Sequence, residues 1–137
     1  MKKVLLCLFI ASYACLGCKK DAAPIEIYLD SNLSTPVILN DDILSFNQND
    51  ATFVIKTDAA KKLKFDLKEK FSLRVGSETV ITGSFWPLFL SSLPDGVYIW
   101  ASEATLRLGY NDARTGKIDT RNDARLIKAL KNSGRLD

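Results

Sequence analysis

The clearest folding signal in this chain is FSLRVGSETVIT, residues 71–82. Apolar and polar side chains alternate through Phe71–Val75, which is the period of a half-buried β-strand. Gly76-Ser77 is a two-residue connection, and its glycine tolerates the positive φ that tight hairpin turns require. Glu78–Thr82 can then return as the partner strand. This stretch therefore predicts an antiparallel hairpin.

Further strands are predicted on both sides of the hairpin. Ile25–Leu29 alternates with a period of two, and Ile43–Phe46 and Thr52–Lys56 are short apolar runs joined by a polar turn. Downstream, Val97–Trp100 and Leu106–Leu108 have the β-branched and aromatic residues that strands favour. The strands are thus short and closely spaced.

One helix is predicted in the middle of the chain. Thr57 is a candidate N-cap, because its hydroxyl can accept a bond from a free backbone N–H of the first turn. Apolar residues then recur at Ala59, Leu63 and Leu67, the spacing of one helix face. The pattern predicts a helix of two turns or more.

A second helix is predicted near the C-terminus. Thr120-Arg121-Asn122-Asp123 matches a capping box, and Gly134 stands where a helix would end. The helix between them would have about twelve residues, with Leu126, Ile127 and Leu130 as its apolar side.

Together these elements predict one α+β domain over residues 25–137. Its sheet would be mixed or antiparallel with about five to six short strands, and its two helices would lie mid-chain and at the C-terminus. No internal repeat, low-complexity tract or second linker interrupts the sequence of these residues.

The N-terminus has the pattern of an exported, lipid-anchored chain. Lys2-Lys3 precedes an apolar run, Val4–Leu16, that is too short to span a bilayer as a stable helix. Gly17-Cys18, a small residue before a cysteine, resembles the lipobox of bacterial lipoproteins. The resemblance implies cleavage before Cys18, a diacylglycerol on its sulfur and an acylated amine. Cys15 after a small residue is the rival site.

This resemblance predicts the domain organisation and the location. Residues 1–17 would be the signal peptide and residues 18–24 a lipidated tether, which holds the protein to the membrane by acyl chains on Cys18. Stretched residues reach roughly 3.3–3.6 Å each, so the body would lie within about 20 Å of the lipid. Lys19 stands where inner-membrane lipoproteins commonly have aspartate, which implies the outer membrane, on its periplasmic or surface face.

Composition excludes several classes of function. The chain has no histidine, and its three cysteines all lie within residues 7–18, so histidine- or thiol-based catalysis and metal ligation are not expected. Of the 19 Lys and Arg residues two are in the leader, which leaves 17 against 16 Asp and Glu. A balanced surface of this kind does not suit nucleic acid. We expect no catalytic residue, metal or cofactor.

Two polar clusters have both a chemical and a structural interpretation. The adjacent carboxylates Asp41 and Asp42 could serve a hydrolase, or they could form a turn or cap before Ile43. Asn47, Asn49 and Asp50 crowd oxygen ligands as a calcium loop does. They lack the glycine and glutamate of an EF-hand, so a plain hairpin turn is the favoured interpretation.

Two aromatic segments are the candidate binding residues. Phe85-Trp86-Pro87-Leu88-Phe89-Leu90 could fill the core, with Pro87 in the first turn of a short helix, or expose part of itself to a partner or to lipid. Tyr98 and Trp100 share one strand face, opposite Val97 and Ile99. The strand could be central and covered on both sides, or it could present an aromatic platform to a ligand.

Cations on the predicted C-terminal helix allow two interpretations as well. Arg121, Arg125 and Lys128 fall at i, i+4 and i+7, opposite its apolar side. They form either an ordinary solvated face or a contact with anionic headgroups or an acidic partner, which the short tether would permit.

The middle of the chain resembles a second known family. Residues 43–45, 53–63, 71–76, 78–81 and 95–99 look like the head part of the large periplasmic domain of SecD, an accessory protein of protein export. There a strand leads into a helix rich in alanine and lysine, then into a strand, a tight turn and a return strand. Gly76-Ser77 replaces the Asp-Gly turn of that family, so the resemblance implies a fold and no export activity.

These observations predict a non-enzymatic, lipid-anchored envelope protein that binds a protein or a glycan. The binding residues would be Phe85, Trp86, Phe89, Tyr98 and Trp100. A carrier or chaperone for an apolar ligand is the alternative, and a carboxylate-dependent hydrolase is a distant third.

Overall fold

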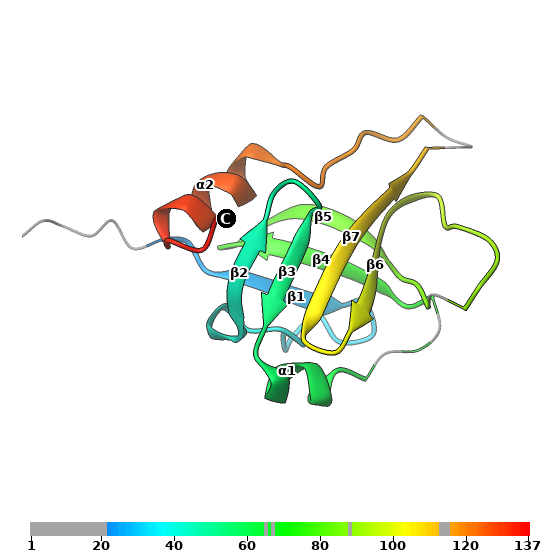
Figure 1. Ribbon diagram of the computed structural model, residues 1–137, viewed down its shortest axis with the longest axis horizontal. Helices are drawn as coiled ribbons and strands as arrows, with labels where there is room; N and C mark the ends of the chain where they lie inside the picture. The colour runs from blue at the N-terminus through cyan, green and yellow to red at the C-terminus, as the bar shows by residue number, and fades with distance from the viewer. Residues whose placement is uncertain (1–21, 65, 67, 88, 113–115) are drawn as a thin grey trace, which may run out of the picture.

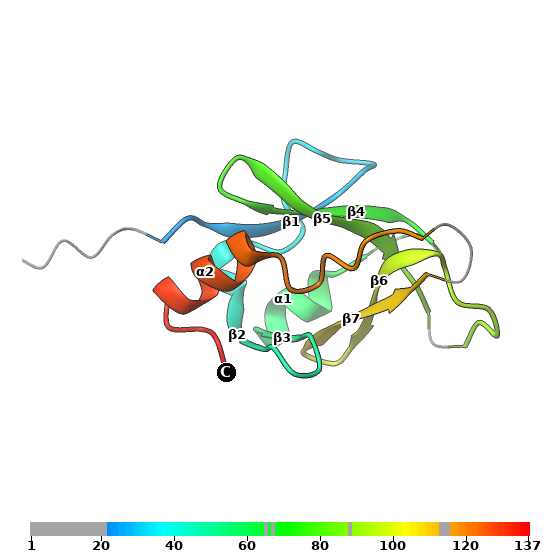
Figure 2. The ribbon, with the colours of Figure 1, turned by 90° about the horizontal axis from the view of Figure 1, so that it is seen from above.

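Seven strands form one curled sheet, a half-barrel, with one short helix in the middle of the chain and one at the C-terminus (Figure 1). The computed structural model describes residues 22–64, 66, 68–87, 89–112 and 116–137. Figure 2 shows α2, residues Ala124–Asn132, at one end of the molecule. The connection between β5, Glu78–Phe85, and β6, Gly96–Ser102, lies at the other end. The predicted single α+β domain is confirmed, with seven strands where five to six were expected.

The strand order is β1-β4-β5-β6-β7-β3-β2. Every neighbouring pair is antiparallel except β5 and β6, which run parallel. Each predicted apolar run is a strand, and the bounds are β1 Ile25–Leu29, β2 Ile43–Asn47, β3 Thr52–Ile55, β4 Lys70–Val75, β5 Glu78–Phe85, β6 Gly96–Ser102 and β7 Thr105–Asn111.

The predicted hairpin is β4 and β5. Val75 pairs with Glu78 across the turn, and Gly76 adopts a φ of 61°, which an L side chain would resist. The pairing register shifts between Leu73 and Arg74. β5 runs three residues further than predicted, to Phe85, because its far end has a second partner in β6.

The parallel pairing of β5 with β6 requires a glycine. Gly83 is the register partner of Val97, and a Cβ on Gly83 would lie 2.2 Å from the Val97 carbonyl oxygen and 2.8 Å from the Phe71 ring. Only a residue without a side chain allows the two strands to approach here.

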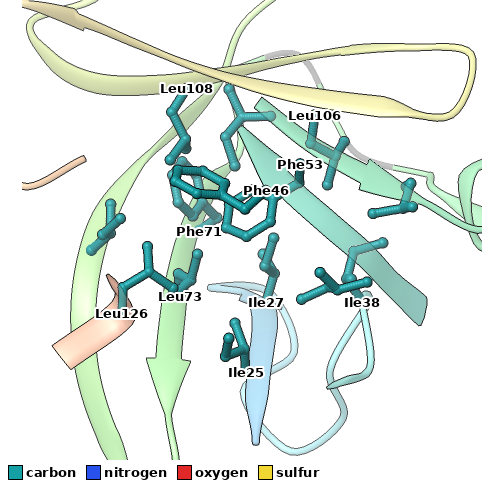
Figure 3. Close-up of a cluster of buried hydrophobic side chains, with 14 of the residues drawn as sticks. Ile25, Ile27, Ile38, Phe46, Phe53, Phe71, Leu73, Leu106, Leu108 and Leu126 are labelled. Carbon is teal, nitrogen blue, oxygen red and sulfur yellow. The ribbon is translucent and has the colours of Figure 1, made fainter. Parts of the chain in front are cut away.

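The concave face of the sheet holds the core (Figure 3). The alternation in β1 buries Ile25, Ile27 and Leu29, as the pattern of two predicts. Two ring pairs fill the interior: Phe46 and Phe53 have centroids 4.5 Å apart, and those of Phe71 and Phe85 are 5.5 Å apart. From α2, Leu126 and Leu130 close the core with no exposed surface.

The first helix, α1, is shorter than predicted and begins differently. It spans Thr57–Lys62, six residues, and its N-cap is Lys56 rather than Thr57. The Lys56 N–H still donates to the Asp42 carbonyl at 2.8 Å, so the extended backbone continues to Lys56. Ala59 is buried as expected, whereas Leu67 lies outside the described residues.

The second helix also begins later than the capping-box pattern predicts. Its N-cap is Asp123, whose carboxylate accepts the Arg125 backbone N–H at 2.9 Å, while Thr120 belongs to the preceding turn. Hydrogen bonds from Arg125 hold the pKa of Asp123 below its usual range. At the other end Gly134 has a φ of 70°, and the N–H of Arg135 reaches the Leu130 carbonyl at 2.9 Å, which is a Schellman ending.

Both edges of the sheet are covered by other parts of the chain. At the β1 edge, the Ile27 N–H donates to the Ile38 carbonyl at 3.0 Å. At the β2 edge, Phe46 exchanges bonds of 2.7 and 2.9 Å with Arg135 and Asp137. Asn40 connects the two edges, because its side-chain oxygen accepts from the Ile25 N–H at 3.0 Å and from the Arg135 guanidinium at 3.1 Å.

Asn40→Ala should therefore lower the free energy of unfolding by about 1–3 kcal/mol, since it leaves a partly buried N–H and a guanidinium without this acceptor. Urea unfolding monitored by circular dichroism measures the change. The matched control is Asn49→Ala in the exposed β2–β3 turn, which should stay within about 0.5 kcal/mol of the parent. Equal effects of the two substitutions would show that Asn40 does not connect the edges.

Candidate functional site

The outer face of the sheet carries a group of aromatic and cationic side chains that we call the aromatic face: Lys68, Trp86, Tyr98, Trp100 and Arg107. Along β6, Val97 and Ile99 point into the core, so the alternation of a strand places Tyr98 and Trp100 on the other side.

Trp100 is the centre of this face. Its ring centroid lies 5.4 Å from that of Tyr98, and the two rings are tilted by 38°. Arg107 is the register partner of Trp100 on β7, and its guanidinium carbon lies 5.3 Å from the Trp100 ring. Trp100 remains half-buried and Arg107 is exposed. The pair therefore combines a cation–π contact with surface that a partner can reach.

Tyr98 lies flat on the backbone of β7. Its register partner is Gly109, and a Cβ on Gly109 would lie 2.2 Å from the phenol ring. Tyr98 is only 6% exposed, although it stands outside the core cluster. β6 is thus a central strand whose outer side is covered at Tyr98 and partly open at Trp100. The predicted covered strand is thus found at Tyr98, and the aromatic platform stays a prediction for Trp100.

Trp86 continues the same face beyond the end of β5. Its backbone N–H donates to the Ile99 carbonyl at 2.8 Å, which extends the parallel ladder by one step and places it beside Trp100 in register. Its indole N–H donates to the Ser92 carbonyl at 2.7 Å and so holds the connection that follows. The Lys68 ammonium lies 5.1 Å from its ring.

The apolar segment 85–90 is divided between core and surface. Phe85 ends β5 fully buried against Phe71, so it is a core residue and not available to a partner. Trp86 is half-buried and Phe89 is 79% exposed. Leu88 lies outside the described residues, and the described residues around it form no helix at Pro87.

The polar clusters singled out in the sequence have structural roles. Asp42 accepts the Leu39 N–H at 3.0 Å within the short helix η1, Asn40–Asp42, and Asp41 accepts from the neighbouring Asn40 amide at 3.3 Å. Asn47 accepts the Asn49 N–H at 2.9 Å in the turn between β2 and β3. The predicted turn before Ile43 and the predicted hairpin turn after Asn47 are both present in the structure. No three His, Cys, Asp or Glu side chains gather as a metal site among the described residues.

The cations near the C-terminus do not form one helix face. Arg121 precedes α2 and pairs with Asp119 at 2.8 Å, so the predicted spacing of three cations along a helix is wrong. Arg125 pairs with Asp123 at 2.8 Å and with Glu78 at 2.9 Å. Lys128 is exposed and lines a groove of about 310 Å³ between α2 and the β4–β5 hairpin, and Ala23 lines the same groove.

In the described part of the chain, neither helix is long and apolar enough to cross a bilayer.

The sequence did not indicate the two cations of the aromatic face. Arg107 meets Trp100 only through the β6–β7 register, and Lys68 reaches Trp86 from the segment between α1 and β4. Neither contact follows a sequence spacing. The one available signal was the aromatic alternation of β6 itself.

Gly109→Ala should destabilise the fold by about 1–3 kcal/mol, because the new methyl group overlaps the Tyr98 ring and must displace it. Thermal unfolding measures the cost. In a Tyr98→Ala background the same substitution should cost much less, since the ring that it overlaps is gone. An unchanged cost in that background would mean that Tyr98 does not lie against Gly109.

The members of the aromatic face are two indoles, a phenol, an ammonium and a guanidinium. Such side chains bind: Trp, Tyr and Arg are the residues that dominate the energy of protein interfaces. Comparison of the chain with family models, with curated proteins and with solved structures finds no match. Of the features described, the aromatic face is therefore the one that points to a function.

Proposed function

We propose that this protein is a non-enzymatic, lipid-anchored protein of the bacterial cell envelope that binds a partner protein through the aromatic face. The observation that carries the proposal is Trp100, half-buried between Tyr98 and Arg107 on the side of the sheet opposite the core. An indole held in this way has lost much of its freedom before binding, so a partner gains contact area at a low cost in entropy.

The geometry favours a protein over a glycan. Arg107 lies over the Trp100 ring and Lys68 lies over the Trp86 ring, so cations already cover part of the ring surface that a sugar would stack on. What remains accessible is a half-buried indole beside a guanidinium. This combination is typical of the centre of a protein–protein interface.

The arrangement of the molecule supports an anchored module. Ala23 lines the groove beside α2, so the chain enters the domain at the α2 end. Trp86 begins the β5–β6 connection, which lies at the opposite end (Figure 2). A tether attached through Cys18 would therefore hold the α2 end toward the lipid and leave this connection directed away from it. Cys18 itself lies outside the described residues.

The two alternatives receive less support. A carrier would hold its ligand between the sheet and residues 85–90, but Phe71, Phe85 and Ile99 fill that position with at most 1% of their surface exposed. For a hydrolase, Asp42 is engaged with its own backbone turn. The carrier and the hydrolase therefore have less structural support than recognition of a partner by the aromatic face.

A photoreactive benzoylphenylalanine in place of Ser102, an exposed residue on the same side of β6 as Trp100, should crosslink to a discrete protein when cells are irradiated. The matched control carries the same residue at Leu44, which is 51% exposed on β2 away from the aromatic face. Position 44 should give no such band, and Trp86→Ala should reduce the band from position 102 by about tenfold, the equivalent of about 1.4 kcal/mol. If positions 102 and 44 give the same pattern, the proposal fails.

The anchor is tested by labelling cells with radioactive palmitate. The wild-type chain should incorporate label and remain with the outer membrane on fractionation, because two or three acyl chains hold effectively without release. Cys18→Ala should abolish the labelling, and Cys15→Ala should retain it. The reverse result would move the anchor to the rival cysteine, and no labelling of the wild type would remove the anchor from the proposal.

A further inference from the structure

The two cations of the aromatic face have different neighbours from the three cations of the domain that form ion pairs. Arg121, Arg125 and Lys117 each lie within 4.0 Å of a carboxylate. Among the described residues, Arg107 and Lys68 form no ion pair, and each has an aromatic ring as its neighbour instead.

The register explains why no carboxylate stands directly opposite Arg107. On β6 its partner is Trp100 and on β3 its partner is Thr52, so neither adjacent strand offers a carboxylate. Arg74 is the instructive contrast on the same side of the sheet. It also stacks on an aromatic ring, that of Tyr28 at 4.2 Å, but its register partner on β1 is Glu26.

A guanidinium that lies over a ring in a cation–π contact still has N–H groups that can donate to another ligand. These N–H groups form a planar fork that matches the two oxygens of a carboxylate. Arg107 is exposed, so this fork is accessible, and the indole beneath limits the orientations that it can adopt. Lys68 adds a second, less directional positive charge next to Trp86.

We expect the partner to be bound by side chains rather than as an added strand at the β1 or β2 edge. Addition of a strand requires a free sheet edge. The β1 edge is bonded to Val37 and Ile38, and the β2 edge is bonded to Arg135 and Asp137. Recognition on the outer face therefore depends on the groups that stand there, which are indoles and cations.

Resting on the proposed function, we infer that the segment recognised by the aromatic face is an acidic segment of the partner protein. One carboxylate would pair with the Arg107 guanidinium, a second would lie near Lys68, and an apolar side chain between them would pack on Trp86 and Trp100.

The test uses the full chain, purified in detergent, and two fluorescent twelve-residue peptides. Both peptides have the same phenylalanines and leucines, but one has four glutamates where the other has four glutamines. Fluorescence anisotropy should show that the glutamate peptide binds at least about tenfold more tightly, and that added NaCl reduces the difference.

Two matched variants assign the effect to its residues. Arg107→Gln should remove the preference for glutamate, whereas Arg74→Gln, which removes the other stacked arginine of the outer face, should leave it unchanged. Circular dichroism should show that both variants are folded, since both residues are on the outer side of the sheet and outside the core.

The inference is overturned if the two peptides bind equally, if neither binds, or if both variants behave alike. Stronger competition by polygalacturonate than by the glutamate peptide, at equal carboxylate concentration, would also overturn it and favour an acidic glycan. These failures are distinct from a failure of the proposed function, because the crosslink from position 102 is measured in cells with the protein's own partner and reports binding whatever the charge of that partner.

Discussion

The parallel pairing of β5 with β6 is the contact on which the rest of the molecule depends. It joins two antiparallel units, β1-β4-β5 and β6-β7-β3-β2, into one sheet that can curl around a single core. Its register also sets which side chains share a side. Phe85 and Ile99 face inward together, and the following step places Trp86 in line with Trp100 on the outside. The β5–β6 register therefore determines both which side chains form the core and which form the aromatic face.

Local structure could be predicted well from the sequence, because it depends on neighbours in the chain. The hairpin at residues 71–82, the alternation in β1 and the turn after Asn47 all follow from short-range patterns, and the structure confirms them. The helix starts were predicted less well. Thr57 and Thr120 both have side chains that can cap a helix, but Lys56 is held in extended backbone by Asp42, and Asp123 is the residue that caps α2.

The arrangement in space could not be predicted, because the sheet order and the single parallel pair are set by contacts between residues far apart in the chain. The candidate site shows the same division. Tyr98 and Trp100 were identified from alternation alone, whereas Phe85 and Phe89, four positions apart in one apolar segment, have opposite environments. Gly109, which makes room for Tyr98, and Arg107, which covers Trp100, become visible only when β7 is placed beside β6.

The bonds that cover β1 and β2 also affect how the molecule behaves among many copies of itself. A sheet with bare margins can recruit strands from neighbouring molecules and seed fibrils. Here Ile38 is bridged to the β1 edge and Leu136 to the β2 edge, so few backbone amides of these two edges are left for a strand of another molecule. At high density on a surface, many copies of such a domain can lie side by side without pairing their sheet edges.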